Sequence, residues 1–440
     1  MIIGIDDTDS KDGMCTTYLT AVLIEKLKKY GTQSGYPLLV RLNPNIRYKT
    51  RGNASLAFSI ELNDNEDAGE VKRSVISAVE DMAIFSDENT NPGVVFIERT
   101  TPQMQDDLFL FSMRAVQDVL EIHEALELLE RHGISHRGYK NKRGLIGALA
   151  AAGFALCHLP DYTFELIAYR EKERWGTPRQ VDENSVWDAA STPDTWDTVD
   201  YENKRIVFAP HSPDPILFGI RGESEGAVRQ AFSMVKSEPI ERHIVYKTNQ
   251  NTDMHLIPAR ISDVRNCRSY IIDGRISKPP GTIKGGHVIF ELSDGSKTLE
   301  CAAFEPTKGF RNIIRQLRTG DEVMVCGSVK DDTLNLEKIR IICLNTHELR
   351  NPLCCGKRMK SMGRGQGYRC EKCGSKREEP VTEIVQRDIS PGFYEVPPSA
   401  RRHLAKPLVR SRTIGAASSC ARSHASVQQA CPPAQGQILF

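Results

Sequence analysis

Three carboxylates stand close together at the start of the chain. Asp6, Asp7 and Asp9 follow directly on the apolar run of residues 2–5. Because like charges repel at this spacing, such a cluster is tolerated in solvent or beside a cation. Carboxylate oxygens suit Mg²⁺, which keeps several waters and bridges to phosphates. The cluster therefore predicts a site for Mg²⁺ and a phosphorylated ligand, with ordinary caps and turns as the alternative.

Two further stretches have the residue types that hold phosphate. Thr16 stands just before the amphipathic run of residues 18–27, which is typical of a helix, and free N–H groups at a helix start bind anions. Farther along, Lys140 and Arg143 lead into a run of small residues that begins at Gly144. Basic charge and close backbone approach at a helix start favour phosphate contact, although tight helix packing explains the glycine equally well.

The elements that must position these residues alternate in type up to residue 258. Short apolar runs at 38–42, 56–62 and 93–98 predict strands, and residues 64–82 and 115–131 have helical periodicity. Alternation of this kind indicates α/β or α+β architecture.

From residue 259 the pattern changes to five short strands, with an apparent helix at 308–317 between the third and the fourth. This order resembles an OB-fold, a small β-barrel that binds single-stranded nucleic acid along its open face. A purely structural barrel is the alternative.

Four cysteines follow in two pairs. Cys354 and Cys355 are adjacent, whereas Cys370 and Cys373 have the two-residue spacing of a zinc knuckle. The pairs predict a zinc ribbon, but adjacent thiolates share one ion only with backbone strain, so the first pair leaves the ligand set open. Basic residues and Tyr368 between the pairs favour contact with RNA or DNA over a merely structural module.

Charge is distributed unevenly along the chain. The formal net charge is +1, yet residues 354–412 contain 14 Lys and Arg against 6 Asp and Glu, a net charge of +8. An acidic body with a basic C-terminal arm predicts that the arm meets a polyanion, and a merely solvated basic tail is the alternative. The Ser-, Ala- and Gln-rich residues 413–440 are predicted to be disordered.

No targeting or membrane segment is visible in the sequence. It contains no run of about 18 apolar residues, which a membrane span requires. The N-terminus lacks the basic region and apolar core of a secretory signal. The sequence therefore predicts a cytoplasmic protein with no membrane contact.

Several motifs occur in a characteristic order along the chain. They are Gly4–Ser10, Gly13–Tyr18, Arg41–Asn45, Tyr48–Gly52, Gly144–Gly147, Asp214–Pro215, Gly219–Gly222, Thr248–Gln250 and the two cysteine pairs. In this combination the chain resembles the archaeal isoleucine-tRNA 2-agmatinylcytidine synthetases (TiaS). The resemblance covers nearly the whole chain up to Arg412.

The resemblance implies an α+β multidomain fold. Residues 1–258 would form a catalytic region with a kinase-like and a ferredoxin-like domain, either consecutive or interleaved. An OB-fold β-barrel at 259–346 and a zinc ribbon at 347–378 would follow. Residues 379–412 would form a basic C-terminal segment, and residues 413–440 the disordered tail.

The resemblance also implies a reaction. Agmatine would be joined to the 2-carbonyl carbon of the wobble cytidine of the isoleucine tRNA with a CAU anticodon, through a phosphorylated cytidine. ATP would be consumed to AMP and phosphate. The product, 2-agmatinylcytidine, would pair with A and so allow AUA to be read as isoleucine. The implied partners are this tRNA and agmatine, and no obligate protein partner is indicated.

Site residues are expected on the matching positions. By the family pattern Asp6, Asp7 and Asp9 would bind Mg²⁺, and Thr16 falls at the position that becomes autophosphorylated. Our candidates for ATP contact are Lys140, Arg143 and Gly144. Because agmatine is a dication, Asp200 and Asp214 are candidates for its pocket. Zn²⁺ would be held by Cys354, Cys355, Cys370 and Cys373, with the adjacent pair departing from the usual knuckle.

Two other functions are compatible with parts of the sequence. A non-catalytic RNA-binding protein would use the OB-fold and the zinc ribbon, but it gains nothing from an acidic cluster that repels phosphate. A nucleotide-dependent small-molecule kinase would use the acidic cluster, but it has no use for the basic arm.

Overall fold

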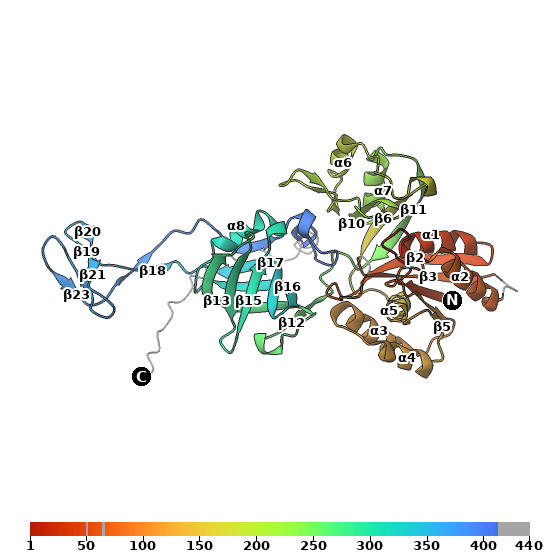
Figure 1. The fold of residues 1–440 in the computed structure, drawn as a ribbon, viewed down its shortest axis with the longest axis horizontal. Coiled ribbons are helices and arrows are strands. Elements are labelled where there is room, and N and C mark those ends of the chain that lie inside the picture. The colour runs from red at the N-terminus through yellow and green to blue at the C-terminus, as the bar shows by residue number, and fades with distance from the viewer. Residues whose placement is uncertain (50–51, 64–66, 412–440) are drawn as a thin grey trace, which may run out of the picture.

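The computed structural model describes residues 1–49, 52–63 and 67–411. Figure 1 shows an elongated molecule in which an α/β region, a β region and a group of small hairpins follow one another. The order matches the predicted mixture of helices and strands. The predicted disordered tail, and residues 64–66 of one predicted helix, lie outside the described residues.

A nine-stranded sheet organises the first 250 residues. Its strand order is β5-β4-β1-β3-β2-β11-β6-β10-β7. β11 pairs parallel to β2, whereas the other neighbours are antiparallel. The strands are β1 (Ile2–Asp6), β2 (Gly31–Arg41), β3 (Ala54–Leu62), β4 (Gly93–Ile97), β5 (Ser135–Gly138), β6 (Thr163–Arg170), β7 (Thr195–Trp196), β10 (Ile216–Gly222) and β11 (Ile240–Thr248).

Helices cover both faces of the first half of this sheet. Side chains alternate between faces along each strand, so Val94 and Phe96 of β4 pack with α1 (Thr16–Leu27) and α2 (Ala68–Met82). Val95 and Ile97 pack instead with α3 (Pro102–Gln117), α4 (Ile122–Arg131) and α5 (Gly144–Cys157). The second half is covered by α6 (Glu183–Ala189) and α7 (Glu225–Met234), beside the small hairpin of β8 (Val199–Asp200) and β9 (Arg205–Ile206).

The single helix predicted for residues 115–131 is wrong. α3 ends at Gln117, where Asp118 has extended backbone angles. A new helix begins after Glu121, which exchanges side-chain and backbone hydrogen bonds with Glu124 in a capping box. The apolar period continues across the break, so periodicity alone did not reveal it.

The β region closes on itself through its strand pairings. β13 (Ser269–Thr282), β14 (Val288–Ser293), β15 (Thr298–Ala303), β17 (Thr333–Cys343) and β16 (Glu322–Lys330) pair in this order, and β16 pairs back to β13. The predicted helix at 308–317 is shorter, with a 3₁₀ turn at Glu305–Thr307 followed by α8 (Phe310–Arg315). β12 (Leu256–Pro258), the first strand after the nine-stranded sheet, pairs parallel to β13.

Short hairpins carry the cysteines. β18 (His347–Arg350) pairs with β24 (Val381–Ile384). Between them, β19 (Leu353–Cys354) pairs with β20 (Lys357–Arg358), and β22 (Tyr368–Arg369) lies between β21 (Lys360–Ser361) and β23 (Lys376–Arg377).

The chain then returns to the nine-stranded sheet. After β25 (Gly392–Glu395) pairs with β17, residues 396–411, here called the C-terminal strap, run back to the α/β region. The Asn251 amide donates to the His403 carbonyl (2.7 Å), and the Thr252 amide donates to the Leu404 carbonyl (3.1 Å). Leu404 and Ala405 are buried.

The arginines of the strap face carboxylates of the chain itself, whereas the prediction that the basic arm meets a polyanion stays a prediction. Arg410 forms ion pairs with Asp161 (2.6 Å) and Glu223 (2.8 Å), and Arg401 pairs with Asp197. These two arginines therefore form their ion pairs with carboxylates of the α/β region. Net charge alone did not show this, because the acids lie far away in sequence.

Within the three described ranges, no helix combines the length and the apolar character needed to cross a bilayer.

Candidate active site

The acidic cluster lies where β1 ends. Asp7 has a φ of +58°, so the chain turns sharply after the strand. The Asn91 amide donates to Asp7 Oδ2 (3.2 Å), and Thr90 Oγ1 donates to the Asp9 carbonyl (2.6 Å). The loop before β4 therefore fixes the cluster from the side.

Burial and mutual repulsion make these carboxyl groups hard to ionise. The pKa of Asp6 is raised well above its ordinary value, first by burial and then by the charge of Asp7. Burial, followed by the charge of Asp9, raises the pKa of Asp7 to about 7. Arg143 opposes both shifts. A bound cation would lower the pKa of these carboxyl groups again, because it favours their ionised form.

Thr16 is the first residue of α1 and is held by Asp9. The Thr16 amide and hydroxyl both donate to Asp9 Oδ1, at 2.9 Å and 2.5 Å. Thr8 Oγ1 in turn donates to the Thr16 hydroxyl oxygen (3.0 Å). Residues 16 and 9 are thus brought together, with the hydroxyl at a helix N-terminus.

Helix α5 contacts the acidic cluster through its glycines. A β-carbon added to Gly147 would lie 2.0 Å from Asp6 Oδ2. One added to Gly144 would lie 2.4 Å from the Gly93 nitrogen. Gly144 therefore serves close packing of α5 against β1 and β4, which is the alternative explanation for the small residues of this helix.

The two predicted basic ATP contacts have different environments. Arg143 lines a cavity of about 70 Å³ together with Asp6, Asp7 and Asp9, and its guanidinium carbon lies 4.3 Å from the ring centroid of Tyr48. Lys140 does not line this cavity. Its ammonium donates to the carbonyls of residues 87 (2.6 Å) and 90 (3.0 Å), so it secures the loop behind Asp9.

Asp9 also lines a second cavity, of about 280 Å³. Thr16, Glu165 and Asp214 are among its lining residues. Phe208 lines it as well, and its ring stacks on Phe218 at 4.8 Å between centroids. The larger cavity thus combines carboxylates with an aromatic residue, and Asp9 borders both cavities.

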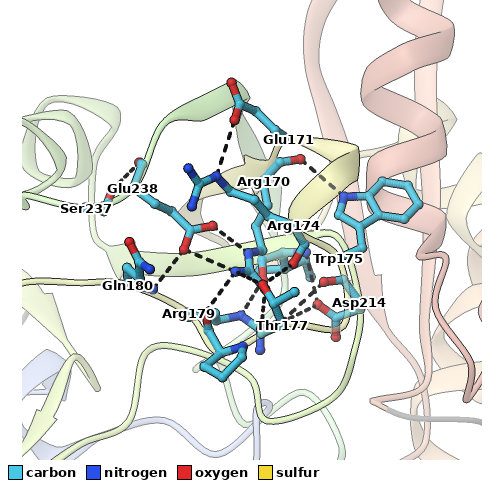
Figure 2. A network of polar contacts seen from close by, with 12 residues as sticks. Arg170, Glu171, Arg174, Trp175, Thr177, Arg179, Gln180, Asp214, Ser237 and Glu238 are labelled. Atoms are coloured by element: carbon cyan, nitrogen blue, oxygen red, sulfur yellow. Dashed lines mark hydrogen bonds and ion pairs between the residues drawn. The ribbon is translucent and has the colours of Figure 1, made fainter.

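Asp214 is fixed by a polar network that Figure 2 shows. Arg179 donates to Asp214 Oδ1 (3.1 Å) and to the Ile216 (2.8 Å) and Ser212 (2.9 Å) carbonyls. The loop of residues 210–215 is therefore clamped by one guanidinium.

A buried ion pair between Arg170 and Glu238 fixes the segment that carries Arg179. Arg170 Nε donates to Glu238 Oε1 (2.6 Å), and its Nη1 donates to the Thr177 carbonyl (2.7 Å). The Gln180 amide donates to Glu238 Oε2 (2.8 Å). The segment that carries Arg179 is thus held at both ends.

The structure does not bring Asp200 to these cavities. Asp200 accepts hydrogen bonds from Asn203 Nδ2 (2.9 Å) and Ser399 Oγ (2.5 Å) and lines another cavity, between β8 and the C-terminal strap. Burial raises its pKa, but these hydrogen bonds outweigh burial and leave it lowered.

Sequence reasoning missed four polar residues of the larger cavity. Arg41, Glu165, Arg221 and His403 come from β2, β6, β10 and the strap. Arg41 and Arg221 stand inside motifs that carry the family resemblance, which was a usable signal. Glu165 and His403 have no local signal, because only the tertiary fold brings them to the cavity.

The four cysteines are brought together. Their sulfur atoms all lie within 4.8 Å of one another, and Cys354 Sγ is 3.5 Å from Cys373 Sγ. Cys355 has a φ of +46°, in the left-handed region. That strained conformation is how two adjacent cysteines turn toward one point, so the set fits tetrahedral Zn²⁺.

The fold and the site together define a multidomain α/β protein with a cluster of carboxyl groups beside a helix start, a closed β region and a four-cysteine module. Family models match nearly all of it: the TiaS TCKD domain at residues 2–141, the TiaS FLD domain at 142–255, an OB-fold nucleic acid binding domain at 270–347 and the TiaS C-terminal zinc ribbon domain at 351–389. The chain belongs to the TiaS family, and the predicted OB-fold and zinc ribbon are confirmed.

Similar proteins cover almost the full length. The chain is 52% identical to a tRNA(Ile2) 2-agmatinylcytidine synthetase TiaS of Methanosarcina mazei over 93% of this chain and 97% of the relative. It is 49% identical to the protein of that name from Archaeoglobus fulgidus, over 94% and 98%.

Solved structures are similar over the same length. A TiaS–tRNA(Ile2)–ATP complex has a TM-score of 0.84 at 49% identity, covering 93% of this chain and 97% of that one. A TiaS–tRNA(Ile2)–AMPCPP–agmatine complex has a TM-score of 0.82 at 46% identity, covering 93% and 96%.

Proposed function

We propose that this protein is an ATP-dependent ligase that joins agmatine to the wobble cytidine of the CAU-anticodon isoleucine tRNA. The names of the relatives, and the similar complexes that contain tRNA(Ile2), ATP and agmatine, support this function over non-catalytic RNA binding. The observation that carries it is the position of Asp9 and Thr16. Asp9 borders both cavities, so a phosphate-handling side and an amine-binding side meet there.

The chemistry requires this arrangement. A cytosine carbonyl oxygen is a poor leaving group, whereas a phosphorylated oxygen leaves readily. Transfer of a phosphoryl group to that oxygen, attack of the agmatine amine on the 2-carbon and loss of phosphate form the new C–N bond. Positioning and charge neutralisation dominate phosphoryl transfer. Overall, ATP and one water molecule give AMP and two phosphates: one phosphate leaves with the former carbonyl oxygen, and the other is released by hydrolysis.

The residues present fit Mg²⁺. Asp6, Asp7 and Asp9 are oxygen donors, and the raised pKa values of Asp6 and Asp7 show carboxylates that lack a compensating charge. When bound there, Mg²⁺ would neutralise phosphate charge. Arg143 would add a fixed positive charge at the same cavity. Thr16 would carry the phosphoryl group at the start of α1, where the helix dipole stabilises it.

The larger cavity suits agmatine. Asp214 supplies a carboxylate for a cationic group, and Phe208 adds an aromatic residue to the lining. Asp214 stays in this proposal. Asp200 does not, because it lines another cavity.

The remaining regions would hold the tRNA. The target base must leave its stack to reach the cavity. The OB-fold and the Zn²⁺-loaded ribbon would grip the RNA, with basic residues such as Arg364 and Arg369 on the ribbon. We further propose the division at 1–258, 259–346, 347–378 and 379–412, with kinase-like and ferredoxin-like parts in the first range. We also propose a cytoplasmic location and a barrel formed by the closed ring of β13–β17.

One assay tests the function. Purified zinc-loaded protein is mixed with labelled agmatine, ATP, Mg²⁺ and the CAU isoleucine tRNA, and a methionine tRNA with the same anticodon is the control. Label should enter the isoleucine tRNA only, and Thr16→Ala and Asp7→Asn should abolish incorporation. Folded protein that incorporates no label would refute the ligase function. Full activity of Thr16→Ala would refute the site while leaving the function intact.

A further inference from the structure

The C-terminal strap supplies one wall of the larger cavity. His403 lines this cavity although it lies outside the residues that the family models match. The strap is fastened on both sides of it, by the Arg401 ion pair to Asp197 and by Arg410 to Asp161 and Glu223. His403 is therefore a fixed part of the cavity.

The protonation of His403 follows from its neighbour. Arg221 Nη2 lies 2.8 Å from His403 Nδ1. A guanidinium only donates, so Nδ1 accepts and the proton of the neutral ring is on Nε2. The charge of Arg41, followed by burial and the charge of Arg221, lowers the pKa of His403 well below its ordinary value. His403 thus presents a neutral ring whose Nε2–H has no hydrogen-bond acceptor among the described residues.

Positive charge gathers around this donor. Arg221 Nε donates to Glu165 Oε1 (3.1 Å), and Gln250 links Glu165 to Arg41, whose Nε donates to Gln250 Oε1 (3.2 Å). Two guanidinium groups thus share one carboxylate. Burial, acting against the charge of Glu165, lowers the pKa of Arg41 to about 10.

Asp9, another carboxylate of this cavity, accepts hydrogen bonds from the amide and the hydroxyl of Thr16. It belongs to the acidic cluster, which is the Mg²⁺ site of the proposed function. The end of the cavity formed by Arg41, Arg221 and His403 is here called the basic corner. It holds two guanidinium charges against the one carboxylate that they share, Glu165, together with the Nε2–H donor of His403. Groups of this kind bind anionic oxygens.

We propose that the basic corner binds a phosphate group, from the tRNA backbone or from ATP, beside Thr16. This rests on the proposed function only in naming those two sources. The planar guanidinium groups match phosphate oxygens in geometry and charge, and the His403 Nε2–H donates to one of them. An amine ligand does not fit there, because it would face two guanidinium groups. The corner thus separates the anionic substrate from agmatine within one cavity.

Equilibrium binding tests the proposal without requiring turnover. Dissociation constants for labelled CAU isoleucine tRNA and for ATP, and for agmatine, are measured with the full zinc-loaded chain and with His403→Ala. We expect roughly ten- to hundred-fold weaker binding of tRNA or of ATP, from loss of one hydrogen bond to a charged group. Weaker binding of tRNA identifies a backbone phosphate, and weaker binding of ATP identifies the nucleotide. Agmatine binding should stay within about two-fold.

Two variants separate contact from structure. His403→Gln keeps a donor close to the position of Nε2 and should recover most of the lost affinity. Val409→Ala changes an exposed strap residue and should bind like the wild type. Equal defects in His403→Ala and His403→Gln, a loss confined to agmatine, or unchanged binding of both tRNA and ATP would each overturn the proposal. Failed label incorporation by the wild type would refute the ligase function alone.

Discussion

Substitution of one glycine should disable the acidic centre with little effect on the fold. An alanine β-carbon at residue 147 would lie 2.0 Å from Asp6 Oδ2 and 2.6 Å from Asp6 Cγ. Carbon–oxygen contacts need about 3.3 Å, so one group must move by more than about 1 Å. α5 is packed between β1 and α3, and on the α3 side a β-carbon on Gly153 would lie 2.3 Å from Ser112 Oγ, so the helix has little room to withdraw. The Asp6 carboxylate must therefore move.

The size of the effect differs between stability and activity. Overpacking costs about 1–3 kcal/mol, and replacing a helical glycine by alanine returns up to about 1 kcal/mol. Gly147→Ala should therefore lose between about 0 and 3 kcal/mol of stability. A misplacement of about 1 Å in a reacting centre costs on the order of 100-fold in rate, so kcat for agmatine incorporation should fall by about that factor.

A matched substitution in the same helix is the control. A β-carbon on Gly153 would lie 2.3 Å from Ser112 Oγ, on the side of α5 that faces α3. Gly153→Ala should therefore show a comparable shift in the urea unfolding midpoint with near-normal kcat. Wild-type kcat in Gly147→Ala, or an equal loss of kcat in both variants, would refute the close contact between Gly147 and Asp6 as a determinant of activity.

Three further predictions address other parts of the molecule. Arg179→Gln should raise the KM for agmatine roughly ten-fold with little change in that for ATP, because the loop that presents Asp214 loses its clamp; equal changes in both KM values would contradict this. Cys355→Ser should weaken zinc retention in a chelator competition and reduce tRNA binding while ATP binding stays normal; full zinc content would show that three cysteines suffice. Burial opposes ionisation of Glu337, but His255 and Arg402 lower its pKa from 4.5 to about 2, so its stabilisation is present above about pH 4.5 and is lost as the pH falls toward 2. Glu337→Gln should therefore lower the urea midpoint at pH 6 much more than at pH 3, and a shift independent of pH would contradict the ion pair.

The sequence indicated the parts of the site that are local in the chain. Asp6, Asp7, Asp9 and Thr16 lie within eleven residues, and a strand end followed by a helix start brings them together. Arg143 reached the same centre through the packing of α5 on β1, which its small residues indicated.

Residues that depend on long-range pairing could not be placed in this way. Glu165 reaches the cavity because β6 lies next to β11, and β11 pairs parallel to β2. Nothing in the local pattern of residues 163–170 specifies those neighbours. Asp200 and Lys140 were predicted to contact a ligand because of their charge, but other groups of the chain occupy them. Asp200 accepts hydrogen bonds from a serine and an asparagine. Lys140 donates to two backbone carbonyls.

In the fold, too, the sequence predicted the local features but not those that depend on long-range contacts. Local apolar periods predicted β1, β4 and most of α1, whereas the break between α3 and α4 depends on a capping box that interrupts a continuous apolar stripe. The ion pairs of the basic strap could not be predicted, because the carboxylates that it meets in space lie far away in the sequence.

The strap also has a consequence for the order in which the protein is made. Synthesis proceeds from the N-terminus, and domains generally fold as they emerge. The sheet that carries Asp9 and Thr16 is complete once β11 has left the ribosome, yet the cavity beside them still lacks His403 until more than 150 further residues are added. A chain that stops short in the OB-fold or the zinc ribbon thus has the acidic centre but lacks the His403 side of its basic corner. The last described segment to be synthesised completes the cavity beside the first segment of the chain.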